Sequence, residues 1–181
     1  ANFETQDSYT LKVRATDAFG KASIGNISVS VENVNDVPTG DVTTSGIAAE
    51  DQTLTAVTTT LADEDGIDTL SYQWLRDGSE ISGATAATYT LNQDDVAKNI
   101  SVKVSYTDDG GTVERLTSAA TSAVSNVNDD PTGAVTISGT ATEDQTLTAV
   151  TTKLDDEDGL GALSYQWKAD GVDISNATNS T

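Results

Sequence analysis

The residues best suited to chemistry in this sequence are Asn and Asp side chains, which gather in two nearly identical segments. The segments read NVNDVPTG from Asn33 to Gly40 and NVNDDPTG from Asn126 to Gly133, and they contain the only two prolines of the chain. Carboxylate and amide oxygens are ligands for hard cations such as Ca²⁺, and the chain has no histidine or cysteine for a softer metal. The same residues also build ordinary turns, so the segments predict either a repeated turn or, more specifically, a repeated joint that holds a cation.

The charge of the chain excludes some functions and favours others. Its 181 residues include 29 acidic and 9 basic ones, which gives a net charge of -20. Proteins that bind nucleic acid or anionic membranes need basic patches, so neither partner is expected. Self-repulsion of this size destabilises a compact state unless something neutralises it, which favours a bound cation. No stretch approaches the roughly 18 apolar residues of a membrane span, and without cysteine there is no disulfide framework.

The elements that must position these side chains belong to a long internal repeat. Residues 38–85 align without a gap with residues 131–178, 93 residues further on, and about two-thirds of the aligned positions are identical. Residues 11–20 align in the same way with residues 102–111, 91 residues further on. A period of this length is typical of whole β-sandwich domains, whereas solenoids repeat every 20–50 residues or so. We therefore expect the C-terminal half of one module (1–38), a complete module (39–131) and the N-terminal half of the next (132–181).

Alternating apolar residues predict the strands of these modules. Within each predicted strand, apolar side chains occur at every second position, as a half-buried strand requires, and no segment shows a sustained helical period. The alternating sets are Tyr9, Leu11, Val13 and Ala15; Leu70, Tyr72 and Trp74; Val102, Val104 and Tyr106; Leu163, Tyr165 and Trp167. Turn sequences such as DEDG, RDGS and DDGG separate the strands. The fold class is therefore all-β.

Two resemblances meet in this repeat. The segment SYQWLRDGSEISGATAATYTL resembles the central strands of an immunoglobulin-like domain without its disulfide, with Trp74 as the core tryptophan. The segment NFETQDSYTLKVRATDAFG, followed by NVNDVP, resembles the second half of a cadherin-like domain. Modules of this mixed kind are similar to the repeat regions of large bacterial surface adhesins exported by type I secretion (RTX-type adhesins). The resemblance implies a linear array of tandem Ig-like/cadherin-like β-sandwich modules of about seven strands each.

The cadherin-like resemblance also implies a set of calcium ligands. In that family a D-x-E element, an A-x-D element, a D-x-D element and an N-D linker bind Ca²⁺ at each domain boundary. At the first joint the matching residues are Glu4, Asn33, Asn35, Asp36, Asp63, Asp65 and Asp108, while Asn2 replaces the first Asp of D-x-E. At the second joint they are Glu50, Asp95, Asn126, Asn128, Asp129, Asp156 and Asp158. Asp17 matches the A-x-D aspartate that would serve a joint before the first residue.

Three classes of function fit such modules to different degrees. An enzyme is not expected, because without His or Cys only carboxylate chemistry remains, and a tandem array leaves no cleft at its joints. A module that binds carbohydrate or protein would need exposed aromatic side chains, but nearly all nine aromatics fall in the inward phase of a strand, Phe19 being the exception. We expect a calcium-stiffened spacer of an extracellular bacterial adhesin, with a binding module as the alternative. The expected partners are neighbouring modules. The half-modules at the two ends either complete each other between copies, by head-to-tail self-association, or belong to a longer array of which this chain is an excerpt.

Overall fold

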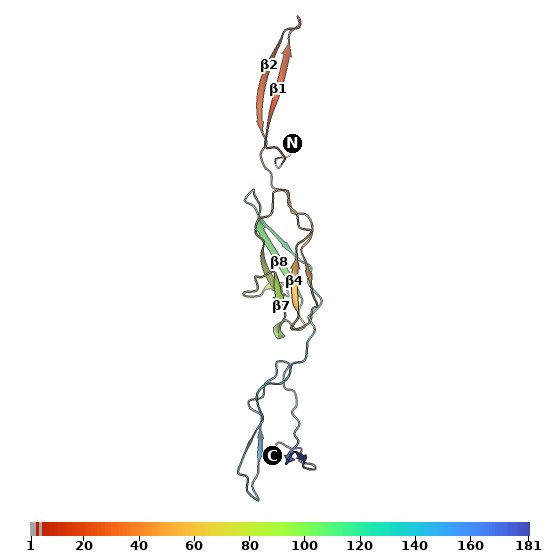
Figure 1. Cartoon of the computed structure of the whole chain (residues 1–181), viewed down its shortest axis with the longest axis vertical. Helices are drawn as coiled ribbons and strands as arrows, with labels where there is room; N and C mark the ends of the chain where they lie inside the picture. Colours follow the sequence, from red (N-terminus) through yellow and green to blue (C-terminus); the bar gives the residue numbers. More distant parts are fainter. Residues whose placement is uncertain (1–2, 4) are drawn as a thin grey trace. The chain divides into compact units, whose positions relative to one another are not determined.

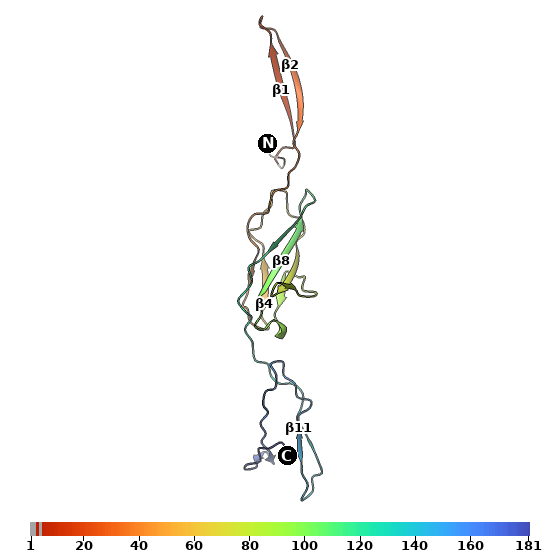
Figure 2. The same ribbon diagram turned by 180° about the vertical axis from the view of Figure 1, so that it is seen from behind.

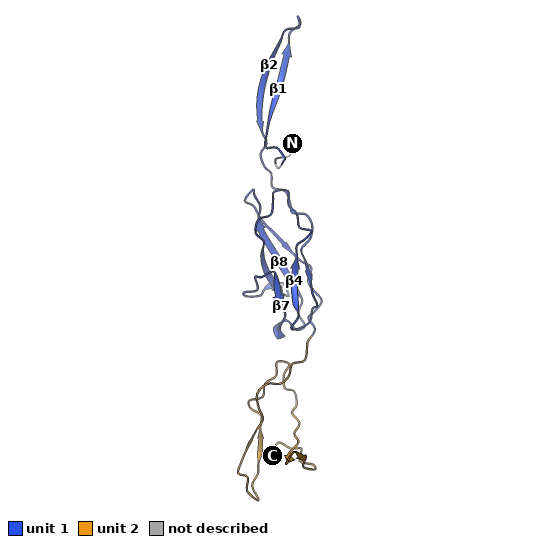
Figure 3. Cartoon of the chain, viewed as in Figure 1, with its two compact units in different colours: residues 1–125 blue, residues 126–181 orange. Residues whose placement is uncertain are grey.

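The computed structural model describes residue 3 and residues 5–181, and this part of the chain is all-β (Figure 1; Figure 2 gives the opposite view). All strand pairs within its sheets are antiparallel, and the single helical element is one turn of 3₁₀ helix, η1 (Gln93–Asp95). No helix among the described residues is long and apolar enough to cross a membrane. The chain divides into two compact units, unit 1 from Ala1 to Ser125 and unit 2 from Asn126 to Thr181 (Figure 3).

The first element of unit 1 is a long hairpin of β1 (Ser8–Thr16) and β2 (Ala22–Ser30). The strands pair from Ser8 opposite Ser30 to Thr16 opposite Ala22. The turn between them is held by the Asp17 carboxylate, which accepts hydrogen bonds from the backbone nitrogens of Phe19 and Lys21. The hairpin therefore forms through its own backbone ladder.

The rest of unit 1 contains two sheets. The three-stranded sheet has the order β3 (Thr43–Ser45), β4 (Thr53–Val57), β7 (Thr88–Thr90). The four-stranded sheet has the order β6 (Ser79–Glu80), β5 (Ser71–Arg76), β8 (Ile100–Thr107), β9 (Val113–Thr117). Strand β8 shows the predicted alternation most clearly, since Val102 and Val104 are fully buried while Lys103 and Ser105 are more accessible.

Side chains from both sheets fill one hydrophobic core. Leu54 comes from the first sheet, and Trp74, Val102 and Val104 come from the second. Trp74 is completely buried, stacks on Tyr89 with 5.8 Å between ring centroids, and donates its indole N–H to the carbonyl of Ala86 at 2.9 Å. The ring thus loses no hydrogen bond on burial, which is the condition for placing a tryptophan in a core.

Unit 2 repeats local features of unit 1. Its strands are β10 (Thr136–Ser138), β11 (Thr148–Val150), β12 (Lys168–Ala169) and β13 (Val172–Asp173). The pairing of β10 with β11 repeats that of β3 with β4, and β12–β13 repeats β5–β6, each 93 residues further on. The hairpin β1–β2 likewise has the register of β8–β9, 91 residues earlier. Near-identical sequences thus form near-identical local pairings.

The Pro-Thr-Gly turn after each Asn-Asp segment is fixed by a close backbone approach. Thr39 and Ala62 exchange two backbone hydrogen bonds of 2.7 and 3.0 Å. Next to them Gly40 has φ of +79°, and a Cβ atom there would lie 1.9 Å from the carbonyl oxygen of Thr60. Gly133 meets the carbonyl of Lys153 in the same way, at 1.8 Å. Only glycine fits, and the turn holds the Asn33–Asp36 segment beside the loop that carries Asp63 and Asp65.

We predict that Gly40→Ala destabilises the protein much more than Gly78→Ala. Gly78 has nearly the same φ, +81°, but a Cβ there would meet nothing within 4 Å. Gly78→Ala should therefore lower the free energy of unfolding by only about 1 kcal/mol, the cost of placing alanine in the left-handed region. Gly40→Ala should lower the free energy of unfolding by roughly 3 kcal/mol or more, because the backbone itself must move to make room for the Cβ atom. Urea unfolding followed by circular dichroism measures both, and equal losses would contradict the close approach.

Candidate metal centres

The first acidic cluster, which we define as Asn33, Asp36, Asp63, Asp65 and Asp108, lies within unit 1. Three segments build it: the Asn-Asp linker after β2, the DEDG loop of residues 63–66, and the tight turn between β8 and β9. The turn at residues 108–111 is held against the DEDG loop by a hydrogen bond from the Asp109 nitrogen to the Asp65 carbonyl oxygen, 2.9 Å. Segments distant in sequence thus place their carboxylates together.

Asp65 connects the linker to the DEDG loop. Its side chain is 4% exposed, and each carboxylate oxygen accepts a hydrogen bond from the linker. The Asn33 amide nitrogen donates to Oδ1 at 2.8 Å, and the Asp36 backbone nitrogen donates to Oδ2 at 2.5 Å. Hydrogen bonds to a carboxylate are stronger than those between neutral groups, so Asp65 fixes the path of the linker.

The negative charge of Asp63 is balanced by donors other than those of the linker. Its Oδ1 accepts from the Asp65 backbone nitrogen at 3.0 Å, and its Oδ2 accepts from the Tyr106 hydroxyl at 2.6 Å. Burial raises the pKa of Tyr106 above its usual range, and the hydrogen bond to Asp63 raises it further. The hydroxyl therefore stays protonated and keeps donating to Asp63 well into the alkaline range.

Asp108 is the buried carboxylate of this cluster whose negative charge is least balanced by hydrogen-bond donors. Its side chain is 4% exposed, and Oδ1 accepts from the Thr112 nitrogen at 2.7 Å. Its Oδ2 is buried and has no hydrogen-bond partner among the described residues. A buried charged oxygen without a partner costs free energy unless a cation neutralises it. Asp108 is therefore the strongest indication in the structure of a cation ligand.

Space is available next to Asn33 and Asp65 of this cluster. A cavity of about 390 Å³ is lined by Phe3, Asn33, Glu64, Asp65, Gly66, Asp109 and Gly110. A Cβ atom on Gly110 would lie 3.2 Å from Asp108 Oδ1 and 3.3 Å from the Asn33 amide nitrogen, so the glycine lets these groups approach. Glu64 and Asp109 were not among the predicted ligands. Their signal was present, since the DEDG sequence of Glu64 recurs around Glu157 and Asp109 directly follows Asp108.

The other residues predicted for the first joint contribute fewer side-chain contacts to this cluster. Asp36 uses its backbone nitrogen and leaves its side chain exposed. The Asn35 amide is exposed and donates to the Asp36 carbonyl and to Glu114. Glu4 lies outside the described residues. Among the described residues, no three carboxylates of this cluster bring oxygens within 4.8 Å of one another, because several of these oxygens already accept N–H or O–H donors.

Unit 2 contains the same arrangement around Asp129, Asp156 and Asp158. The Asp129 nitrogen donates to Asp158 Oδ2 at 2.8 Å, and the Asp158 nitrogen donates to Asp156 Oδ1 at 2.9 Å. These bonds match Asp36–Asp65 and Asp65–Asp63, 93 residues earlier. Asn128 donates to the Asp129 carbonyl, as Asn35 does to that of Asp36, and Asn126 is exposed.

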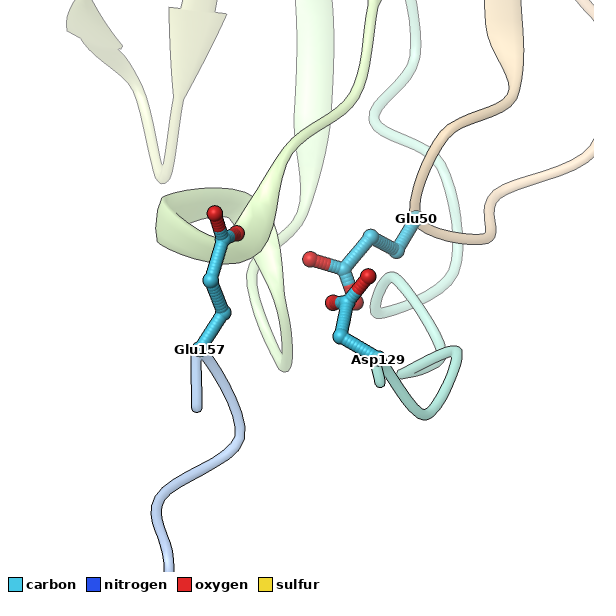
Figure 4. A group of neighbouring side chains, drawn as sticks. All are labelled: Glu50, Asp129 and Glu157. Atoms are coloured by element: carbon cyan, nitrogen blue, oxygen red, sulfur yellow. The ribbon is translucent and has the colours of Figure 1, made fainter. Parts of the chain in front are cut away.

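Glu50 is a buried acidic residue of unit 1, 1% exposed. Its backbone nitrogen donates to the Ser125 carbonyl at 2.9 Å, and the Gln93 amide, with its nitrogen turned toward Glu50, donates to the carboxylate at 2.7 Å. Figure 4 shows its carboxyl group together with those of Asp129 and Glu157, which belong to unit 2. Each of the three offers a carboxylate oxygen of the kind that binds a metal ion.

The structure gives Asp95 and Asp17 other bonding partners. Asp95 is fully buried and accepts from Arg76 Nε at 2.7 Å, from the Tyr89 hydroxyl at 2.8 Å and from the Asn92 nitrogen at 3.0 Å. The bond to Asp95 raises the pKa of Arg76, while burial, followed by Asp95, raises the pKa of Tyr89 to about 12. These protein donors compensate Asp95 without an ion, and Asp17 holds the β1–β2 turn.

The chemistry of the first acidic cluster fits a hard cation. Its carboxylates offer oxygen ligands, and oxygen-only sets bind Ca²⁺, Mg²⁺ or Mn²⁺. No protein-family model, curated protein or solved structure matches this chain. The assignment of a function therefore depends on these residues and their geometry.

We predict that Asp95→Ala destabilises the protein equally with and without calcium. The substitution leaves Arg76 without its buried partner and should lower the free energy of unfolding by about 3 kcal/mol. Asp94→Ala is the matched control, because Asp94 lies in the same helical turn, 3.8 Å from Arg76, but its side chain is 81% exposed. Its loss should be below about 1 kcal/mol. A much larger effect of Asp95→Ala in calcium than in EDTA would show instead that Asp95 is a ligand.

Proposed function

We propose that this chain is a calcium-stiffened extender of an extracellular bacterial surface adhesin, which holds a distal binding domain away from the cell. In this proposal the chain is built of tandem Ig-like/cadherin-like β-sandwich modules. The observation that carries it is the buried carboxylate of Asp108, whose Oδ2 has no partner among the described residues and lies in the same cluster as the Asn33–Asp65 bond. A cation at this position would neutralise Asp108 and bind the linker at the same time.

Calcium suits the cluster better than magnesium. Ca²⁺ accepts six to eight oxygen ligands in flexible geometry, whereas Mg²⁺ requires a near-ideal octahedron and keeps several waters. The cluster offers carboxylates and an amide on three separate segments, and these can adjust to a larger ion more easily than to a rigid octahedron. Calcium near 1 mM is also what extracellular modules bind, with dissociation constants of about 10⁻⁴–10⁻³ M.

The distribution of aromatic side chains supports an extender over a ligand-binding module. Trp74 is fully buried and Tyr106 is 3% exposed, so neither is available to stack on a sugar or anchor a protein partner. Phe19, at 93% exposed, and Phe3, at 38% exposed, are the exposed aromatics of the described part of unit 1. The repetition of the Asp36–Asp65 bond as Asp129–Asp158 also suits an extender, whose joints must have the same geometry at every repeat.

We predict that Asp108→Asn changes the sign of its effect on stability when calcium is added. In EDTA the variant should unfold at the same temperature as the parent or higher, because an uncompensated buried charge is removed while an oxygen remains for the Thr112 nitrogen. In about 10 mM calcium, above the expected dissociation constants, it should unfold at a lower temperature. The parent gains roughly 2.7 kcal/mol per site when free calcium is about 100 times the dissociation constant.

Differential scanning calorimetry of both proteins in EDTA, calcium and magnesium measures this effect. Asp41→Asn is the control, because it removes the same charge from an exposed side chain outside the cluster. It should respond to calcium as the parent does. An unchanged melting temperature of the parent between EDTA and calcium, or a gain from magnesium as large as that from calcium, would refute the proposal.

We also predict that calcium makes the linker segments stiff. Bare carboxylates repel one another, whereas an ion with ligands from a linker and from the loop beside it should fix the linker. Small-angle scattering should therefore report a less flexible chain in calcium than in EDTA. Replacing Asp63 and Asp65 with Asn should remove this stiffening at the first linker only, and replacing Asp156 and Asp158 should remove it at the second only. Identical scattering curves in the two conditions would contradict stiffening.

A further inference from the structure

Four asparagines of the chain stand in the acceptor sequence for N-linked sugars, Asn-x-Ser/Thr. Asn26 and Asn99 are each followed by Ile-Ser, Asn176 is followed by Ala-Thr, and Asn179 is followed by Ser-Thr. In a chain rich in Ser and Thr such triplets also arise by chance, so the sequence alone does not distinguish an acceptor from a coincidental match. The structure separates the four by their surroundings.

The internal repeat shows that both acceptor sequences of unit 2 result from a change to asparagine. Asn176 and Asn179 correspond to Gly83 and Ala86, 93 residues earlier, and the threonine two positions further on is present in both copies. An asparagine in place of a glycine is common in left-handed turns, and Asn176 has φ of +58°. That reason does not apply to Asn179, which replaces an alanine and has no positive φ. What the two changes share is the completed acceptor sequence.

Asn176 lies in an exposed turn that leaves its side chain accessible. The turn is closed by a hydrogen bond of 3.2 Å from the Ala177 nitrogen to the Ile174 carbonyl. Gly83 occupies the same place in unit 1, where the Ala84 nitrogen donates to the Ile81 carbonyl, also at 3.2 Å. A Cβ atom on Gly83 would meet nothing within 4 Å, although the sheets of this part of unit 1 are packed around a core. A side chain at this turn position therefore points into open space.

Asn26 and Asn99 have less favourable positions. The Asn99 amide nitrogen donates to the Thr121 carbonyl at 2.7 Å, and its backbone nitrogen donates to the Asp77 carboxylate at 3.0 Å. Asn26 lies in the middle of β2, opposite Lys12, so its backbone belongs to the hairpin ladder. An enzyme that modifies the folded protein would have to break these hydrogen bonds to reach either residue, whereas acceptor asparagines normally lie in surface loops.

We propose that Asn176 is a residue at which the folded chain accepts an N-linked sugar. The donor is a sugar carried on a diphosphate, and a transferase that recognises Asn-x-Ser/Thr brings the two together. The amide nitrogen of Asn176 forms a bond with the anomeric carbon of the sugar, while the bond from that carbon to the diphosphate oxygen breaks. The diphosphate leaves with the bonding electrons, and the amide proton goes to a base of the transferase. None of the proposed calcium ligands takes part, so this inference does not depend on the extender function.

Glycosylation of the folded chain in vitro tests the proposal. The probe is uridine diphosphate glucose with a soluble asparagine glucosyltransferase, chosen because it modifies isolated peptides around Asn26, Asn99 and Asn176. The full chain carries Asn179→Gln, so that the signal from unit 2 comes from Asn176 alone. Peptide mapping by mass spectrometry should find glucose on Asn176 and none on Asn26 or Asn99. Equal modification of all three in the folded chain, or none on Asn176, would overturn the proposal.

Three further variants separate the acceptor sequence from the turn that presents it. Thr178→Ala should abolish the modification of Asn176, whereas Thr178→Ser should retain it, because the hydroxyl is part of the recognised sequence. Gly83→Asn adds an asparagine before Ala84 and Thr85 and should create a new site of glucose transfer in unit 1. Modification that survives Thr178→Ala, or a folded Gly83→Asn variant that gains no glucose at this turn, would contradict the proposal.

Discussion

Compensation of buried negative charge is the constraint on which the rest of this structure depends, because the chain has 29 acidic residues and only 9 basic ones. Two solutions are visible in unit 1. Asp95 is compensated by Arg76, Tyr89 and a backbone nitrogen, which anchors η1 to the core. Asp65 is compensated by amide donors of the linker, which fixes the linker to the DEDG loop. Asp108 accepts a hydrogen bond on Oδ1, while its buried Oδ2 has no partner among the described residues, which is the position that the proposed cation would neutralise.

The close approach of backbone at Gly40 and Gly133 turns this electrostatic arrangement into a defined geometry. Each glycine lets the chain pass against a carbonyl oxygen, and the adjacent threonine then pairs with the segment that leads into the acidic loop. The loop carboxylates can therefore meet the linker amides at a fixed distance in both units.

The remaining features concern apolar side chains, some of which are buried in a core while others are exposed. Between β4 and β8 the alternating side chains of two sheets form one core around Trp74. The hairpin β1–β2 and unit 2 have the same patterns and the same registers, yet Leu11, Val13 and Leu163 remain substantially exposed. Backbone pairing and local turns are thus sufficient to shape these segments, even where their apolar side chains remain exposed.

The sequence alone determined the all-β class and the strands around Trp74 and Val104, because alternation is a local pattern. The grouping of Asp63, Asp65 and Asp108 at one joint was implied only by the cadherin-like resemblance. It did not separate Asp95 from the other acidic residues, since a family motif carries no information about Arg76, 19 residues away along the chain. Glu64 and Asp109 were likewise missed, although both line the cavity. The tertiary structure decided these points, because the state of a buried carboxylate depends on which donors the fold brings within hydrogen-bond distance. For the same reason only the fold could show that one oxygen of Asp108 has no donor in the part of the chain that the structure describes.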